Sequence, residues 1–119
     1  MVIAHQQLNE MTILIRGMEA LRREFQSQDL QMQTALLFLQ VGQHGEVSMS
    51  DLEKQVGISQ ASVSRGVGVL STGRPDEPGR GILEAFEDPY YRRRKIVKLT
   101  PRGKSMFNRI IEAMRKGFA

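Results

Sequence analysis

The chain contains no cysteine, and among its 119 residues it has only two histidines. Without cysteine it can form no disulfide bond, bind no zinc through thiolates and sense no oxidant through a thiol. The histidines, His5 and His44, do not have a metal-ligand spacing. No metal and no cofactor are therefore predicted, and the lack of cysteine fits a reducing compartment.

Long hydrophobic runs are also missing. No apolar stretch approaches the roughly 20 residues that a membrane-spanning helix needs. The run "MTILI" at residues 11–15 is too short and poorly placed for the core of a signal peptide. We therefore expect a cytoplasmic protein that does not contact the membrane.

Residue patterns typical of enzymes are absent as well. The serines of "SQASVS", residues 59–64, have no local base to activate them. Gly66 and Gly68 do not follow a strand, as the glycines of a phosphate-binding loop would. The carboxylates of "SDLEKQ", residues 50–55, are explained by helix capping. The chain is therefore not expected to be an enzyme.

Acidic residues are missing from two stretches of the chain. The formal net charge is +4, and no Asp or Glu lies between Glu53 and Asp76 or between Asp88 and Glu112. The second stretch contains "RRRK", residues 92–95. This distribution of charge indicates an anionic partner, and nucleic acid is the first candidate.

Three longer helices are predicted from apolar residues that recur at spacings of three and four. The first covers about Ala4 to Phe25, and the second covers about Gln31 to Gln43 and is apolar on most sides. The last begins after Thr100, which with Pro101 forms a typical helix start, and runs to about Lys116.

Two short helices lie between them. Ser50 and Glu53 form a capping box, which predicts a helix from Asp51 to Gly57. Ser59 is a second N-cap candidate and predicts a helix over 60–70. Two short helices joined by a tight turn form a helix–turn–helix, here at residues 50–71.

A β-hairpin is predicted next. "ILEAF" and "KIVKL" have strand-like composition and are joined by "EDPYYRRR", whereas "STGRPDEPGRG", residues 71–81, is typical of a loop. The fold class is therefore mainly α with a small β-hairpin. The predicted architecture is a winged helix–turn–helix in a single domain, residues 1–119, with its wing at residues 80–99.

The helix over 60–70 has two different faces. Val63, Val67 and Leu70 fall together and are predicted to pack inward, with Gly66 beside them to let another helix approach. The opposite face has no acid, no long aliphatic chain and one guanidinium, Arg65. Such a face suits the DNA major groove, although a helix of small residues can also be packed on both sides.

Short polar groups near the start of this helix are the candidates for base contacts. Arg65 can form two hydrogen bonds with guanine or bind a phosphate. The predicted DNA-binding residues of the helix are Ser59, Gln60, Ala61, Ser62, Ser64 and Arg65.

The wing is predicted to contact nucleic acid through its basic tip. Phosphates would neutralise the crowded cations, and an arginine at a wing tip can enter an A·T-rich minor groove. The alternative is a solvated basic turn. The predicted contact residues are Arg92, Arg93, Arg94 and Lys95.

The chain resembles the MarR family of multiple-antibiotic-resistance-type regulators. "DLEKQVGISQASVSRGVGVL" is similar to the recognition segment of that family, and "DPYYRRRKIVKLTPRG" is similar to its wing. The resemblance implies a dimeric regulator with its recognition helix in the major groove and a wing arginine in the minor groove. It also implies that Asp88 braces a wing arginine.

Three features depart from the family pattern. Glu53 stands where the family usually has alanine, and Tyr91 stands where a wing acid is common. The segment 71–81 is longer than the usual connection, and its Arg74 and Arg80 could add contacts to the DNA backbone.

The outer helices, within residues 1–28 and 101–119, carry apolar ridges. We expect these ridges to form a homodimer interface, and the alternative is that they cap their own domain. The predicted interface residues are Leu8, Met11, Ile15, Met18, Phe107, Ile110, Ile111 and Met114. A small-molecule effector is suggested by the resemblance alone.

The predicted function is that of a sequence-specific regulator of transcription, expected to be a repressor, which binds double-stranded DNA at a near-palindromic site as a homodimer. One alternative is a winged-helix accessory factor in replication or in contact with RNA polymerase, with little sequence preference. Another is a protein-interaction module whose apolar ridges bind a partner.

Overall fold

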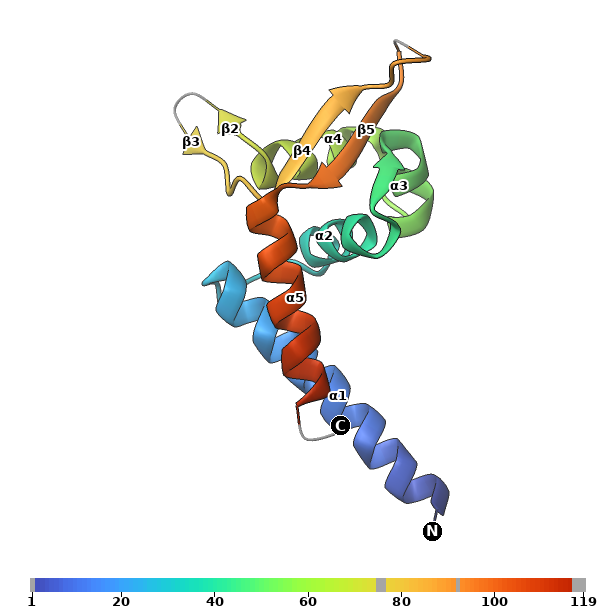
Figure 1. Cartoon of the computed structure of the whole chain (residues 1–119), viewed down its shortest axis with the longest axis vertical. Coiled ribbons are helices and arrows are strands. Elements are labelled where there is room, and N and C mark those ends of the chain that lie inside the picture. The colour runs from blue at the N-terminus through green and yellow to red at the C-terminus, as the bar shows by residue number, and fades with distance from the viewer. Residues whose placement is uncertain (1, 75–76, 92, 117–119) are drawn as a thin grey trace. The chain divides into compact units, whose positions relative to one another are not determined.

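The computed structural model describes the backbone of residues 2–74, 77–91 and 93–116 (Figure 1). It describes the side chains from residue 9 onward within these ranges, except those of residues 74, 77 and 78. The chain forms two units. One consists of the residues up to Leu30 together with those from Met106 onward, and the other is Gln31–Ser105.

The first unit pairs α1 (Val2–Phe25) with the C-terminal part of α5 (Pro101–Arg115). Both helices were predicted with nearly these bounds. Gly17 lets them approach, because a Cβ atom there would lie 3.1 Å from the sulfur of Met114. Glu24 accepts hydrogen bonds of 2.9 and 2.8 Å from the Nε and Nη2 atoms of Arg109.

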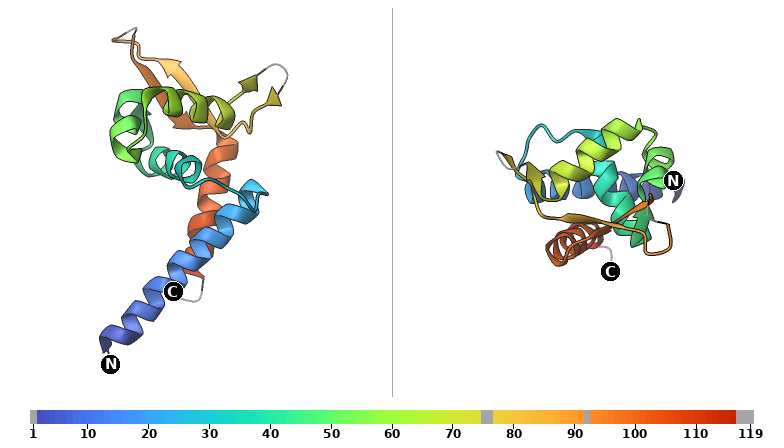
Figure 2. Two further views of the ribbon diagram at one scale, coloured as in Figure 1. Left: turned by 180° about the vertical axis from the view of Figure 1, so that it is seen from behind. Right: turned by 90° about the horizontal axis from the view of Figure 1, so that it is seen from above.

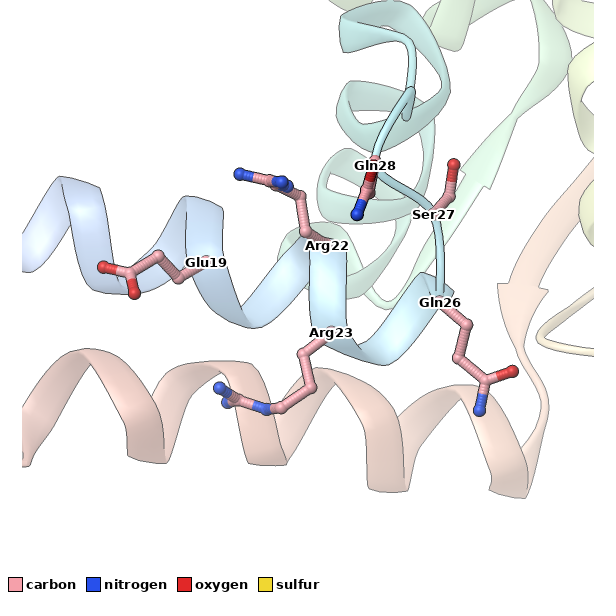
Figure 3. A pocket seen from close by; sticks show the side chains of 6 residues that line it. All are labelled: Glu19, Arg22, Arg23, Gln26, Ser27 and Gln28. Atoms are coloured by element: carbon pink, nitrogen blue, oxygen red, sulfur yellow. The ribbon is translucent and has the colours of Figure 1, made fainter.

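The end of α1 adopts an unusual backbone conformation. Gln26 has a φ of 52°, in the left-handed region that glycine usually occupies. Its amide donates to the Arg23 carbonyl, and the Ser27 amide donates to the Arg22 carbonyl. These two bonds form the Schellman motif that ends many helices. Figure 3 labels the four residues concerned at the end of α1.

The second unit is built around α2 (Met32–His44), as the apolar composition of that segment predicted. Its sheet has the antiparallel order β1-β5-β4, with β1 at Glu46–Ser48, β4 at Leu83–Glu87 and β5 at Lys95–Leu99. Val97 of β5 pairs with Val47 on one side and with Ala85 on the other. The core of this unit includes the following fully buried side chains: Leu37, Phe38, Val41, Leu52, Val63, Leu70, Ile82, Leu83 and Val97.

Two details differ from the sequence prediction at the start of α3 (Met49–Val56). The N-cap is Ser48, whose hydroxyl accepts a hydrogen bond of 3.1 Å from the Asp51 amide, so the helix begins before the predicted Asp51. Ser50 lies inside the first turn instead of capping it. The cause is β1, a strand too short to show a pattern, which holds Ser48 in the extended conformation that an N-cap needs.

The segment between α4 (Gln60–Leu70) and β4 was predicted to be a loop, but it contains a second hairpin (Figure 1). Its strands are β2 (Gly73–Arg74) and β3 (Glu77–Pro78). Below the hairpin, the amides of residues 79–82 donate to carbonyls of residues 69–72, with distances from 2.7 to 3.0 Å. These bonds close the stem, so the chain returns to the end of α4 before β4 begins.

The predicted fold class is confirmed, because helices dominate and the described strands form two small antiparallel sheets. None of the helices in the described part of the chain is long and apolar enough to cross a membrane.

Candidate nucleic-acid interface

The turn between α3 and α4 is formed by residues 57–59. Gly57 takes a left-handed φ of 77° and donates its amide to the Glu53 carbonyl at 2.8 Å, which ends α3. Ser59 then caps α4, because its hydroxyl accepts a hydrogen bond from the Ser62 amide. The predicted bounds of α4, Gln60–Leu70, are confirmed.

The inner face of α4 packs as the sequence predicted. Val63, Val67 and Leu70 are buried. A Cβ atom on Gly66 would overlap the Cδ1 methyl of Leu37 in α2, so the absence of a side chain at Gly66 allows α2 and α4 to approach. This contact fixes which face of α4 points away from the unit.

The outer face of α4 is free of acids, and most of its predicted contact residues are exposed. Arg65 is exposed and has no ion pair with any residue that the structure describes. Ser62 is half-buried, and its hydroxyl lies 3.0 Å from that of Ser59, which donates to it. These two hydroxyls are therefore partly used in capping. The exposed candidates are Ser59, Gln60, Ala61, Ser64 and Arg65.

The wing is the hairpin of β4 and β5, which projects beyond α3 and α4 (Figures 1 and 2). Asp88 organises its tip. The Asp88 amide donates to the Arg94 carbonyl at 2.8 Å, and one oxygen of its carboxylate accepts from the Tyr90 amide at 2.8 Å. The other oxygen lies 3.8 Å from Arg94 Nε, so Asp88 contacts a wing arginine through both backbone and side chain.

The cations of the wing differ in their surroundings. Arg94 also lies 4.0 Å from the carboxylate of Asp51, so it connects the wing to the first turn of α3. Arg93 and Lys95 are exposed and have no acidic partner within the described ranges. Arg92, the remaining predicted contact, lies outside the described residues. Arg93 and Lys95 are therefore the described wing cations that are most available to an external anion.

The predicted interface residues of the outer helices fall into two groups. On α1, Met11, Ile15 and Met18 are exposed. Leu14, which is not among the predicted residues although it lies one turn before Met18, is exposed as well. The side chain of Leu8 lies outside the described residues. On α5, Phe107, Ile111 and Met114 are half-buried, while Ile110 is 1 % exposed and packs inside its own chain.

A hollow lies at the end of α1 (Figure 3). It is open to solvent and is lined by Glu19, Arg22, Arg23, Gln26, Ser27 and Gln28. Its lining is polar and mostly exposed, with Ser27 half-buried. Within the described residues, no cluster of His, Asp or Glu side chains could hold a metal ion.

Comparison with known proteins gives no match to a family model and none to a curated protein sequence. Solved structures do match. Rv1404 from Mycobacterium tuberculosis has a TM-score of 0.75 with 17% identity, over 98% of this chain and 75% of that one. The transcriptional regulator PA4135 has a TM-score of 0.64 with 22% identity, over 99% and 78%. Reduced AbfR bound to DNA has a TM-score of 0.63 with 14% identity, over 98% and 80%.

The structures found in this way are those of MarR-family transcriptional regulators. The chain has a MarR-like winged-helix fold. In the MarR-like arrangement, α3 and α4 are the helix–turn–helix, and β4 with β5 is the wing. The resemblance to the MarR family that the two sequence segments indicated is therefore confirmed for the fold. Several of the matching structures are described as those of transcriptional regulators.

Proposed function

We propose that the chain is a MarR-family regulator of transcription that binds double-stranded DNA as a homodimer, at a near-palindromic site, and acts as a repressor in the cytoplasm. The observation that carries this proposal is the outer face of α4. It is exposed, has no acid and presents Arg65, which has no ion pair with a described residue. The wing, in the same unit, presents Arg93 and Lys95, which likewise have no ion pair within the described ranges. AbfR, which shares the fold, is bound to DNA in its structure.

The two parts of the interface have different tasks in this proposal. Arg65 and Gln60 read base edges in the major groove, where an arginine can bind O6 and N7 of guanine. Arg93 enters the minor groove or contacts the phosphates beside it. Arg94 positions the wing through Asp88 and Asp51, and contributes less to DNA contact than Arg93 does.

The homodimer rests on the exposed ridge of α1. Met11, Leu14, Ile15 and Met18 place large apolar side chains in water along one helix, and a second copy of the chain would cover them. A two-fold dimer presents its recognition helices about 34 Å apart, one turn of DNA, and reads the same half-site twice. Ile110 is left out of the proposed interface because it is buried within its own chain.

The experiment that tests the function is a selection of bound fragments from sheared genomic DNA of the source organism, at near-physiological salt. Enrichment of a near-palindrome supports the regulator. Broad recovery without a motif would instead support an accessory factor that binds DNA without regard to sequence.

Two variants test the division of tasks. Arg65→Ala should lose about 1–3 kcal/mol of discrimination at one base pair. Arg93→Ala should weaken binding to all sequences and lower the slope of log affinity against log salt by about 0.9, the effect of one phosphate contact. Equal effects of both variants on every sequence would contradict this division.

The dimer is tested by sedimentation of Met18→Glu. The charge that this substitution places in the α1 ridge should prevent dimerisation, so the variant should sediment as a monomer. It should also bind near-palindromic DNA more weakly than the wild type does. Met32→Glu is the matched control, because Met32 in α2 is 70% exposed and Met18 is 50% exposed. A Met18→Glu protein that remains dimeric would show that the α1 ridge is not the interface.

A further inference from the structure

The wing tip carries two adjacent tyrosines, Tyr90 and Tyr91, which are here called the aromatic tip. Their backbone is held on both sides. The Tyr90 amide donates to the carboxylate of Asp88, and the Tyr91 carbonyl accepts from the Arg94 amide at 2.9 Å. The Asp88 side chain that makes the first bond is only 12% exposed. The hairpin therefore presents both tyrosines from a defined backbone.

The rings themselves are in water. The Tyr90 residue is 87% exposed and Tyr91 is 66% exposed. Neither ring makes a hydrogen bond or ring contact with any residue that the structure describes. Packing within the described part of the chain therefore does not explain why two large aromatic side chains occupy this position. A contact with another molecule would explain it.

The charges around the aromatic tip indicate the chemistry of that contact. Arg93 and Lys95 lie just after it and are unpaired within the described residues. Cations beside exposed aromatic rings suit a partner that combines phosphates with flat or apolar groups, which nucleic acid does through its bases and sugars. A phospholipid surface shares part of this chemistry. Nucleic acid is favoured because the outer face of α4, in the same unit, is also free of acids.

We propose that Tyr90 and Tyr91 contact bound DNA directly, with their rings packed against deoxyribose and base edges in the minor groove beside the Arg93 contact. This inference rests on the proposed DNA-binding function and adds a contact to it. Packing of a ring against sugar or base removes apolar surface from water and releases no counterions from phosphates. The aromatic tip should therefore contribute affinity that does not depend on salt.

The test measures binding of a labelled mixed-sequence duplex, about three helical turns long, by fluorescence anisotropy over a series of salt concentrations. The variants are Tyr90→Ala/Tyr91→Ala, Tyr90→Phe/Tyr91→Phe and Arg93→Ala. Met32→Ala is the control for loss of an exposed apolar side chain elsewhere in the unit. Thermal unfolding of each variant checks the fold, which should be unchanged because the replaced side chains are exposed.

The double alanine variant should bind about ten-fold more weakly at every salt concentration, with the same salt slope as the wild type. The double phenylalanine variant should bind like the wild type, since it keeps the rings. Arg93→Ala should change the slope, and Met32→Ala should change nothing.

Three results would overturn the inference. In the first, the wild type binds DNA and the double alanine variant binds equally well, which removes the aromatic contact but leaves the proposed function intact. In the second, the double alanine variant changes the salt slope as Arg93→Ala does. In the third, the double substitution leaves DNA binding unchanged but abolishes binding to anionic phospholipid vesicles, which would assign the tip to a membrane surface. A wild type that binds no duplex would instead refute the proposed function, and this inference with it.

Discussion

The Cδ1 methyl of Leu37 in α2 fills the space that a side chain on Gly66 in α4 would need. Leu37 is itself buried in the core, so it has little room to move away. We expect Gly66→Ala to lower the free energy of unfolding by about 1–2 kcal/mol, because overpacking outweighs the gain in helix propensity. Urea unfolding measures this change.

The matched control is Gly68→Ala, two residues further along the same helix. A Cβ atom on Gly68 would meet nothing within 4 Å. This substitution should raise the free energy of unfolding by up to about 1 kcal/mol, through helix propensity alone. If both substitutions stabilise the protein equally, then Leu37 can move to make room for a Cβ atom at residue 66, and the packing of α2 against α4 does not require glycine there.

A second prediction concerns the end of α1. Gln26 is the only non-glycine residue with a positive φ within the described residues, and it ends the helix in the position that favours glycine. Gln26→Gly should therefore stabilise the protein by about 1 kcal/mol, measured by thermal or urea unfolding. Gln28→Gly should not, because Gln28 lacks a positive φ and the added freedom favours only the unfolded chain.

The third prediction is a dependence of stability on pH. The hydrogen bonds from Arg109 hold the pKa of Glu24 below its ordinary value of 4.5. A carboxyl with a lowered pKa in the folded state adds stability that is fully present above its pKa in the unfolded chain and is lost as the pH falls through the folded value. Glu24→Gln should therefore be less stable than the wild type at neutral pH, and the difference should shrink below pH 4.5.

Urea unfolding at neutral pH and at a series of pH values from about 5 to 3 provides this measurement. Glu19→Gln on the same helix is the control, since Glu19 has no ion pair with a described residue. A stability difference between wild type and Glu24→Gln that stays constant over the whole range would contradict the role of the ionised pair.

The fourth prediction distinguishes two effects of acidic residues in the wing on DNA binding: their negative charge and their role in positioning other residues. On charge alone, removal of any acid from the wing should strengthen DNA binding. Asp88→Ala should instead weaken it several-fold, because Asp88 positions Arg94 and the backbone of Tyr90. Glu87→Ala, which removes an exposed acid next to it, should strengthen binding slightly. Anisotropy titrations with duplex DNA would show whether the two variants change affinity in opposite directions, as this account requires.

The sequence alone predicts the parts of the fold that depend on local signals. The left-handed Gly57 and the Ser59 cap set the turn before α4, and the spacing of Val63 and Val67 sets its buried face. The exposure of Arg65 follows from the same spacing. These features need no information about distant parts of the chain, because helix caps and helical periodicity act over a few residues.

The features that the sequence alone does not predict depend on contacts between distant residues. β1 has too few residues to show a strand pattern, and it exists because β5 pairs with it. The ion pair between Asp51 and Arg94 joins two segments far apart in the sequence, so no local pattern indicates it. Ile110 and Met18 occupy similar apolar ridges, but only packing decides that the first is buried and the second is exposed.

The closed stem below β2 and β3 has a consequence for how this chain tolerates changes in the length and sequence of the hairpin. Its hydrogen bonds bring the chain back to the end of α4, so the residues beyond the stem add length without altering the path from α4 to β4. We therefore expect insertions between β2 and β3 to leave α4 and β4 in their places. The same property makes this hairpin a suitable site for inserting a peptide epitope.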